Sequence, residues 1–401
     1  MLFDNYLIFI YILTVVLVYN GVKRITQNVL IRNLVILASN VLILLFFVKE
    51  HTIIVLAVFS IVVYGVGIAL QKQASVFKLG LALAFVISLF IIRNYTLVQE
   101  IFIESFLSFL NVPILSVQKI GLSYMLFRYI HWLVESNKGT IHKPDFLSFV
   151  NYILFFPSVL AGPIDTFNNF RFWVGNSRFQ YQKSLFFAGI TRIFLGAFKT
   201  IGLVPLIIAY ATDYKLLLAD FPHIAAVSLS LLAYSTYIFL DFSGYSDIAI
   251  GTAYMLGIKT PENFNSPYAS QNLAEFWRRW HITFSLFLRM YVFKPSIRLY
   301  NRILGTKHKL PITVLCYLST FVVCGLWHGS SLNFVYWGLW HGVGLALNKV
   351  WTTYISPNFS FQNSPVYQAL SICITFLYVS FGWVFFHYNT AQLAEIAHLF
   401  I

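Results

Sequence analysis

The stretches DFSGYSDIAIG (241–251), FWRRWHITFS (276–285) and GLWHGSSLNFVYWGLWHG (325–342) place polar and charged side chains inside long apolar sequence. Together they carry two aspartates, three histidines and two adjacent arginines. Such groups are costly at membrane depth unless they are paired or line a cavity. We therefore predict that region 241–342 holds the functional site and that the rest of the chain supports it.

The composition around these stretches indicates an integral membrane protein. Of 401 residues, 59% are hydrophobic and 10% are charged, with a mean hydropathy of +0.75, whereas soluble proteins carry about 25% charged residues. The net charge of +13 comes from basic residues in short loops between apolar runs, which is typical of membrane topology and does not indicate a nucleic-acid partner. Cys316, Cys324 and Cys373 lie in apolar segments, and we expect them to be core residues, neither disulfides nor metal ligands.

The apolar runs predict an all-α polytopic protein with about eleven spans in a single domain, residues 1–401. The predicted spans, some of them short or irregular, are 6–19, 34–48, 53–70, 79–98, 120–134, 146–160, 201–211, 224–256, 311–326, 332–347 and 366–386. Lys23, Arg24 and Arg32 follow the first span and place the first loop in the cytoplasm and the N-terminus outside. The first run lacks a basic leader and a cleavage site, so we expect it to be retained.

Three segments depart from simple spans. Segment 101–117 is amphipathic and broken by Pro113, which favours an interfacial or re-entrant position. Segment 146–160 is short and is followed by Gly162-Pro163, which is typical of a broken or re-entrant helix that the protein buries. The basic amphipathic stretch through Arg171, Arg178, Lys183 and Arg192 is expected to lie on the cytoplasmic surface.

His328 is the first candidate catalytic residue. It ends an apolar run between Trp327 and Gly329, and an imidazole there is suited to taking a proton from a hydroxyl group near neutral pH. The alternative is a histidine that only hydrogen-bonds a neighbouring helix. His281 and His341 are further candidates, the latter in a second Trp-His-Gly.

Arg278 and Arg279 suit a phosphate or pantetheine-bearing donor at the cytoplasmic mouth, or simply anchor the chain at the membrane surface. Asp241 and Tyr245 are four residues apart and share a helix face, whereas Asp247 points elsewhere. Either aspartate is suited to orienting a histidine or holding the Phe-Ser-Gly-Tyr backbone. The histidine spacing matches no common metal motif, so we predict no metal site.

At these residues the chain resembles the membrane-bound O-acyltransferase family, in its bacterial polysaccharide branch. Four ordered motifs carry the resemblance across residues 123–347: FFPSVLAGPID (155–165), 241–251, PENFNSPYASQNLAEFWRRWHITFSLFLR (261–289) and 325–342. The resemblance implies a ring of tilted helices around a central tunnel in a multi-pass protein of the bacterial cytoplasmic membrane.

By the same resemblance, His328 is the catalytic base and His281 the second catalytic histidine of the tunnel. Our further candidates for donor binding and for the tunnel are Arg278, Arg279, Trp280, Trp327, Ser285, Asp241, Tyr245 and His341. The donor is a thioester, acetyl-CoA or an acyl-carrier protein, with no bound cofactor. An extracytoplasmic acyltransferase or relay protein and a polysaccharide acceptor are the expected partners, together with membrane lipid.

Two members of this branch compete. The 241–251 and 276–285 motifs are similar to the alginate O-acetylase type, which favours acetyl transfer. The length and the Ile-Asp after Gly162-Pro163 are similar to the D-alanyl transfer protein of teichoic acid modification. Met290 stands where acetylase relatives usually carry an acid, and the chain ends at Ile401 without their C-terminal extension. We expect acetyl transfer, with D-alanyl transfer as the alternative.

Two other classes are compatible with a polytopic chain that has buried charges. A transporter of a lipid-linked sugar predicts two related halves with broken helices, and we detect no such symmetry. A scaffold that recruits an extracellular transferase predicts no thioester turnover.

Overall fold

The computed structural model describes residues 6–47, 50–94, 122–175, 182–358 and 364–398. Within these ranges the regular structure is helical, without a β-strand, and seven helical segments are long and apolar enough to cross a membrane. These are Tyr6–Ile25, Val29–Phe46, Ile53–Lys72, Lys183–Thr212, His223–Met255, Lys309–His328 and Pro365–His387. The prediction of an all-α polytopic protein is therefore confirmed. The ring of helices and its tunnel stay predictions, and segment 101–117 lies outside the described residues.

The chain divides into two compact units, residues 1–198 with 244–261 and residues 199–243 with 262–401. Helix α11 (His223–Met255) runs through both. At about 1.5 Å per residue, its 33 residues make it much longer than the hydrocarbon core of a bilayer is thick. The single-domain prediction stays a prediction.

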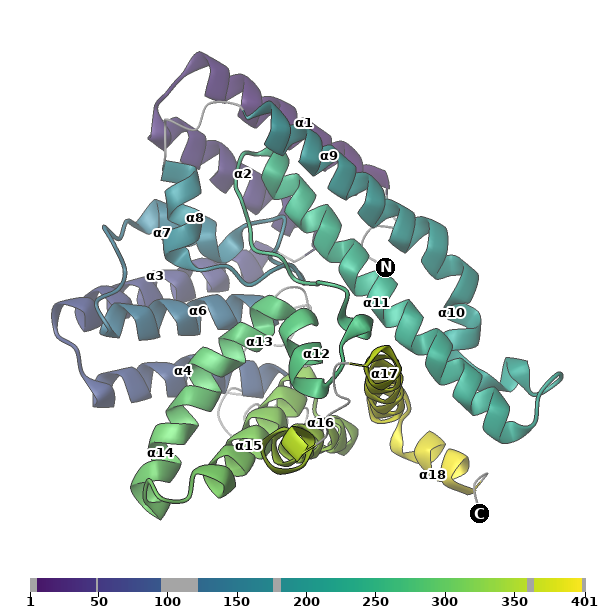
Figure 1. Ribbon diagram of the computed structural model, residues 1–401. Coiled ribbons are helices and arrows are strands. Elements are labelled where there is room, and N and C mark those ends of the chain that lie inside the picture. Colours follow the sequence, from purple (N-terminus) through teal and green to yellow (C-terminus); the bar gives the residue numbers. More distant parts are fainter. Residues whose placement is uncertain (1–5, 48–49, 95–121, 176–181, 359–363, 399–401) are drawn as a thin grey trace, which may run out of the picture. The chain divides into compact units, whose positions relative to one another are not determined.

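The first unit is helical (Figure 1), and Trp132 is a fully buried residue of its hydrophobic core. Its helices are α1 (Tyr6–Ile25), α2 (Val29–Phe47), α3 (Glu50–Lys72), α4 (Val76–Asn94), α6 (Leu122–Asn137), α7 (Phe146–Leu154), α8 (Phe167–Gly175), α9 (Lys183–Ala197) and the end of α11. Trp132 of α6 is 0% exposed and contacts the rings of Tyr64, Phe149 and Phe167 at 4.6–5.5 Å. A Cβ at Gly67 would lie 2.0 Å from the Trp132 ring nitrogen, so the packing of α3 on α6 requires glycine there.

The irregular segment after α7 is held by a buried arginine. α7 ends at Leu154, and most residues from 155 to 165 are buried although they are not helical. Arg128 is 1% exposed, and its Nη1 donates to the backbone oxygens of Tyr152 and Ile153, each at 2.8 Å. Its Nη2 donates to the backbone oxygen and hydroxyl of Ser158 at 3.0 and 2.7 Å. The expected broken helix is present, and a side chain replaces the missing helical hydrogen bonds.

The carboxyl group that ends this segment makes stability depend on pH. Burial raises the pKa of Asp165 from 3.8 to about 6, although Asn169 and the Thr166 backbone N–H donate hydrogen bonds to it. Between these values the folded carboxyl holds a proton that the unfolded one has lost. The free energy of unfolding is therefore expected to fall by up to roughly 3 kcal/mol as the pH rises from about 4 to about 6. Thermal unfolding of Asp165→Asn in detergent should depend less on pH than that of the wild type, whereas the exposed Asp220→Asn should match the wild type. An unchanged pH dependence in Asp165→Asn would contradict this role.

Helices α9 and α11 approach closely through glycines in the first unit. A Cβ at Gly189 would lie 2.6 Å from the Gly251 oxygen, and one at Gly196 would lie 2.5 Å from the Gly244 oxygen. Between these two contacts, Arg192 Nη1 donates to Asp247 Oδ1 at 2.7 Å. Small residues with a polar pair are typical of helix packing in membranes. The expectation of a position on the cytoplasmic surface is wrong for Lys183 and Arg192, because Lys183–Thr212 is a continuous 30-residue apolar helical run. For Arg171 it stays a prediction, and Arg178 lies outside the described residues.

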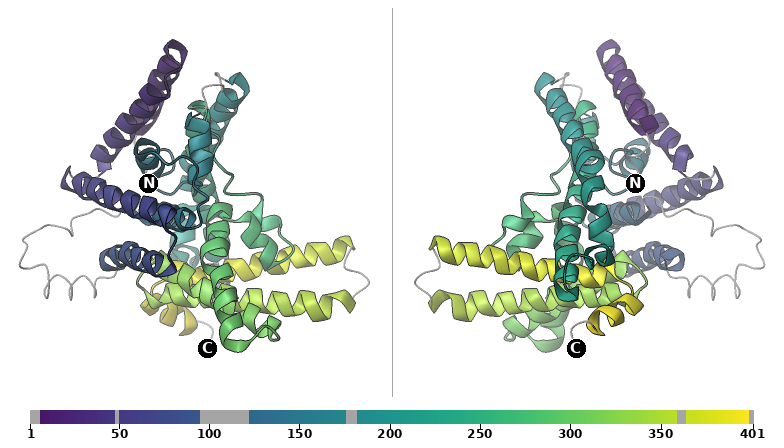
Figure 2. Two further views of the ribbon diagram at one scale, coloured as in Figure 1. Left: turned by 90° about the vertical axis from the view of Figure 1, so that its left-hand side faces the viewer. Right: turned by 90° about the vertical axis from the view of Figure 1, so that its right-hand side faces the viewer.

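The second unit contains two antiparallel helices in close contact, α15 (Lys309–His328) and α16 (Leu332–Val350), with α17 (Pro365–His387) beside α16 (Figure 2). Its other elements are the end of the π-helical turn Phe198–Leu203, α10 (Val204–Thr212), the start of α11, α12 (Leu273–Arg279), α13 (Ile282–Leu288), α14 (Lys294–Leu304), α18 (Thr390–His398) and short helical turns. Cβ atoms at Gly325 and Gly338 would lie 2.1 and 2.2 Å from the backbone oxygens of Phe334 and Phe321. Glycine is therefore required on both faces of the α15–α16 contact.

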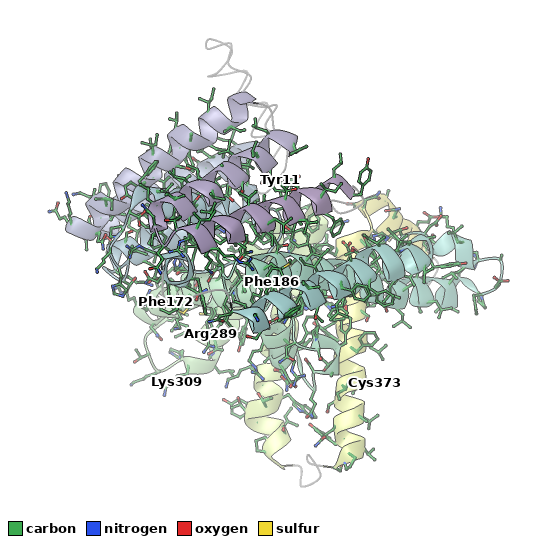
Figure 3. All side chains as sticks on the ribbon, turned by 90° about the horizontal axis from the view of Figure 1, so that it is seen from above. Tyr11, Phe172, Phe186, Arg289, Lys309 and Cys373 are labelled. Carbon is green, nitrogen blue, oxygen red and sulfur yellow. The ribbon has the colours of Figure 1, made fainter. Side chains whose placement is uncertain are left out.

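The cysteines agree only in part with the expectation that all three are core residues. Cys316 and Cys324 are buried in α15, but Cys373 is exposed on α17 (Figure 3). Hydropathy alone does not distinguish a cysteine that faces the protein interior from one on the outer surface of an apolar helix.

Candidate active site

His328 lies where α15 ends and the chain turns toward α16. Gly329 follows it, and a Cβ there would lie 2.4 Å from the Phe334 ring. The imidazole is only partly buried and contacts the rings of Trp327, Phe386 and Trp337 at 4.5, 4.9 and 5.0 Å. The predicted base is therefore held by aromatic side chains of α15, α16 and α17 and keeps some exposure.

His281 lies at a sharp break between α12 and α13. Its φ of 42° is in the left-handed region, which is uncommon for a residue other than glycine. The Ser285 backbone N–H donates to the His281 oxygen at 2.9 Å, and the Ser285 hydroxyl donates to the Trp280 oxygen at 3.3 Å. The imidazole is 3% exposed. Such backbone conformations cluster at functional sites, where the surrounding packing maintains them.

Asn263, which we did not single out from the sequence, determines which nitrogen of His281 carries the proton. Asn263 is 0% exposed, and its Oδ1 lies 3.0 Å from His281 Nδ1. The same oxygen accepts from the backbone N–H and the hydroxyl of Thr283, at 3.4 and 2.9 Å. Because a backbone N–H can only donate, this atom is the amide oxygen, and Nδ1 must be the protonated nitrogen of a neutral His281. Nε2 is left as a proton acceptor.

The two histidines belong to one aromatic cluster. The Phe284 ring lies 4.9 Å from the His281 ring, 6.4 Å from the His328 ring and 4.7 Å from the Trp327 ring. The imidazoles are also near enough to interact electrostatically. Two histidines separated by 47 positions in the chain are thereby brought near one phenylalanine ring.

His341 lies deeper in the same unit than either of these histidines. It is 0% exposed, and its ring lies 5.0 Å from both Trp277 and Trp337. Trp337 also contacts His328, so one indole separates the histidines of the two Trp-His-Gly motifs. Among the described residues, neither His341 nitrogen has a hydrogen-bond partner. The site role of His341 stays a prediction.

The adjacent arginines have different surroundings. Arg279 Nη2 pairs with Glu275 Oε1 at 2.6 Å within α12, and the other Glu275 oxygen accepts from the Gln271 backbone N–H. Arg278 is exposed and interacts electrostatically with Tyr317. Arg278 is therefore the more available of the two for an anionic donor. Donor binding by either stays a prediction.

The remaining predicted residues have structural partners as well. Trp280 is 4% exposed and contacts Phe264 and Trp383. Asp241 interacts electrostatically with Tyr237 and Tyr234, and the next residue, Phe242, contacts the His281 ring at 4.8 Å. Asp247 pairs with Arg192, as described above.

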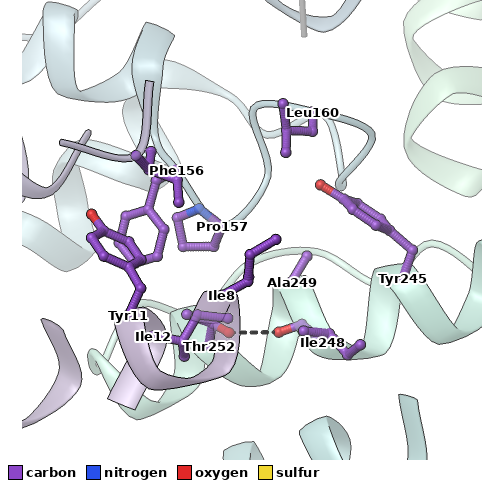
Figure 4. A pocket seen from close by; sticks show the side chains of 11 residues that line it. Ile8, Tyr11, Ile12, Phe156, Pro157, Leu160, Tyr245, Ile248, Ala249 and Thr252 are labelled. Atoms are coloured by element: carbon purple, nitrogen blue, oxygen red, sulfur yellow. Dashed lines mark hydrogen bonds between the residues drawn. The ribbon is translucent and has the colours of Figure 1, made fainter. Parts of the chain in front are cut away.

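Tyr245 belongs to the first unit, where its hydroxyl accepts a hydrogen bond from the Ala161 backbone N–H at 3.1 Å. It lines a cavity of about 30 Å³ between apolar side chains of α1, segment 156–160 and α11 (Figure 4). A cavity of this volume admits one or two waters at most, so it has no room for an acyl donor.

Asn263 provides a test of the His281 arrangement. Asn263→Asp keeps the acceptor oxygen but adds a negative charge beside Nδ1, which favours protonated His281. The acid limb of the activity–pH profile is therefore expected to move to higher pH, and Asn263→Ala should lose roughly tenfold in activity. Asn265→Asp, which adds the same charge at an exposed position two residues away, is the control. A profile in Asn263→Asp that coincides with that of Asn265→Asp would contradict the assignment.

Comparison with known proteins gives consistent matches. The model of the MBOAT, membrane-bound O-acyltransferase, family matches residues 60–390. Teichoic acid D-alanyltransferase of Bacillus subtilis is 31% identical over 276 residues, which cover 67% of this chain and 68% of the relative. Probable alginate O-acetylase AlgI of Pseudomonas aeruginosa is 32% identical over 276 residues, 69% of this chain and 50% of the relative. Peptidoglycan O-acetyltransferase of Helicobacter pylori is 31% identical over 258 residues, 62% of this chain and 45% of the relative. The matches to the latter two span about half of those relatives.

Proposed function

Because this chain belongs to the membrane-bound O-acyltransferase family and is accordingly an O-acyltransferase, we propose that it transfers an acetyl group from a cytoplasmic thioester toward an extracytoplasmic polysaccharide. The observation that carries the proposal is the pairing of His328 and His281 around Phe284. Two imidazoles near each other in an aromatic cluster are suited to proton transfer, because an imidazole can take up and release a proton near neutral pH.

In this proposal His328 is the general base. It takes the proton of the acceptor hydroxyl as that oxygen attacks the thioester carbonyl carbon. The tetrahedral intermediate then expels the thiolate as the carbon–sulfur bond breaks, and protonated His328 returns the proton to sulfur. The products are an ester and a free thiol, so the proton count balances without a metal or redox cofactor.

His281 has a different part in the proposal. Its Nδ1–H is committed to Asn263, so Nε2 can accept a hydrogen bond but cannot donate one to a developing oxyanion. It is therefore suited to orienting the acceptor hydroxyl, or the N–H of His328, during the transfer. Arg278, which is exposed at the end of α12, would contact the anionic part of the donor.

D-alanyl transfer from a carrier protein is the second candidate. The similarity to the teichoic acid D-alanyltransferase of Bacillus subtilis, which covers about two thirds of both chains, favours it. The similarity to alginate and peptidoglycan O-acetylating proteins favours acetyl transfer. Both candidates use the same histidines and differ in the donor and the acceptor.

The test is release of free thiol by the purified full chain in detergent, with acetyl-CoA and a D-alanyl carrier protein supplied separately and an oligosaccharide acceptor present. Thiol release from acetyl-CoA with formation of an acetyl ester supports the proposal. Release from the carrier protein alone supports D-alanyl transfer. Ester formation from neither donor, with a positive-control transferase active in the same assay, would contradict both.

We further propose that the protein lies in the bacterial cytoplasmic membrane with its N-terminus outside and works with an extracytoplasmic acyltransferase or relay protein. Lys23, Arg24 and Arg32 after the first span support this orientation. Labelling of single cysteines with a membrane-impermeant maleimide tests it. A cysteine at position 27, in the first loop, should react only in inverted vesicles. Reaction in intact cells would contradict the orientation.

A further inference from the structure

We propose that Arg32 and Lys23 form a binding site for a phosphate group in the first unit, where α1 ends and α2 begins. Arg32 is the fourth residue of α2, and its side chain is 2% exposed. An arginine that only anchors a loop at the membrane surface would keep its head group in water. Burial of a permanent positive charge at this position therefore needs a compensating group.

The Arg32 guanidinium lacks such a group among the described residues. Its Nε and Nη2 are buried and have no hydrogen-bond partner. Arg128 of the same unit shows how this protein pairs most of a buried arginine from within: four hydrogen bonds satisfy its Nη1 and Nη2, and only its Nε lacks a partner among the described residues. Buried polar groups of native proteins are nearly always paired. The unpaired Nε and Nη2 of Arg32 therefore indicate that a ligand binds there.

A second positive charge lies close to the first. Lys23 of α1 is partly buried and interacts electrostatically with Arg32. Its Nζ lies over the backbone of Gly257, at 2.7 Å from the place of a Cβ. Gly257 has a φ of +77°. Glycine is therefore favoured at this position both by the backbone conformation and by the close approach of Lys23. In the described part of the chain, neither cation has an ion pair. Two like charges at close range destabilise the fold unless an anion lies between them.

The geometry of the unpaired groups specifies the class of anion. Nε and Nη2 form one edge of the guanidinium, and this edge binds two oxygens of one phosphate or carboxylate side by side. In the first turn of α2, the Leu30 N–H donates to the Asn28 side chain at 2.8 Å and the Arg32 N–H to the Asn28 backbone oxygen at 3.4 Å, so neither is available to a ligand. The ligand contacts would come from the side chains of Arg32 and Lys23.

The position along the spans makes a phosphate the expected ligand. Lys23 lies near the end of one membrane span and Arg32 near the start of the next, at the depth of phospholipid head groups. A lipid head group and a soluble phosphate present the same oxygens to the site. The source of the phosphate is therefore a question for experiment.

The experiment measures thermal unfolding of the delipidated full chain in uncharged detergent. The probes are dioleoyl phosphatidylglycerol, dioleoylglycerol, which lacks the phosphate, and inorganic phosphate. Arg32→Met removes the site charge, Lys23→Gln removes the partly exposed partner, and Arg24→Gln is the control on an exposed neighbour. Without a probe, Arg32→Met should unfold at or above the wild-type temperature, because an uncompensated buried charge has been removed.

Phosphatidylglycerol, but not dioleoylglycerol, is expected to raise the unfolding temperature of the wild type and Arg24→Gln. Arg32→Met and Lys23→Gln should weaken its apparent affinity roughly tenfold or more. A comparable rise with inorganic phosphate alone would support a soluble ligand at the same site. The proposal is overturned if neither phosphate probe raises the unfolding temperature of the wild type. It is also overturned if the active probe stabilises Arg32→Met and Lys23→Gln as strongly as it stabilises the wild type. Should Arg32→Met fail to fold, Lys23→Gln provides the same comparison.

Discussion

Replacing His328 with alanine is expected to reduce acyl transfer by roughly 10²–10⁴-fold, the range that a positioned general base contributes. The side chain lies at the end of α15 in partial exposure and contacts aromatic rings of α15, α16 and α17, so its removal takes away both the proton acceptor and these contacts. His328→Gln keeps a polar side chain of similar volume but cannot take a proton, and it should lose a similar amount of activity. The measurement is ester formation with saturating donor and acceptor, together with the unfolding temperature of each variant.

The matched control for this prediction is His308→Ala. It removes an exposed histidine that immediately precedes the first residue of α15. It should retain wild-type activity within about twofold, because surface substitutions away from a site have small effects. The role of His328 as base is contradicted if His328→Gln retains activity comparable to that of His308→Ala. A lower unfolding temperature in the His328 variants would instead indicate a structural contribution.

Arg128→Met is expected to cause the largest loss of stability. The substitution leaves the backbone oxygens of Tyr152, Ile153 and Ser158 buried without their donor. An unsatisfied buried acceptor costs about 1–3 kcal/mol, so a loss of roughly 3 kcal/mol or more is expected. Methionine fills much of the volume, so the loss reports on the hydrogen bonds more than on a cavity.

Thermal unfolding in detergent and protease sensitivity of segment 155–165 measure this effect. Arg298→Met, which removes an exposed arginine of α14, is the control and should unfold as the wild type does. If both variants unfold at the same temperature, Arg128 does not hold the broken segment in place. Arg128→Lys should be intermediate, because one ammonium group cannot reach all four acceptors.

The spans that could be predicted are those whose apolar run is uninterrupted. Prediction of 311–326 and 366–386 agrees with α15 and α17 to within three residues, because length and hydropathy alone determine such helices. Of the run Lys183–Thr212, the sequence predicts only 201–211 as a span, because Arg192 interrupts the hydropathy of its first half. The partner that neutralises Arg192 is 55 residues away, and a window along the chain does not contain that information.

In the candidate site, too, some residues could be identified from the sequence and others only from the structure. His281 and His328 stand out because imidazoles are rare in apolar sequence and occur in ordered motifs. Asn263 does not stand out, because an asparagine near a proline reads as an ordinary turn residue. The signal that identifies it is the buried contact with His281 across 18 residues. Only the folded chain distinguishes an asparagine that sets a proton position from one that makes a turn.

The Arg192–Asp247 pair also has a consequence for biosynthesis. During synthesis α9 leaves the ribosome well before Asp247 does, and an arginine near the centre of a new span opposes insertion by about 2.5–3.5 kcal/mol. Neutralisation of Arg192 must therefore wait for the segment that carries Asp247 and the paired glycines. The two segments are expected to enter the lipid phase together, so that the order of events at the translocon depends on one long-range ion pair.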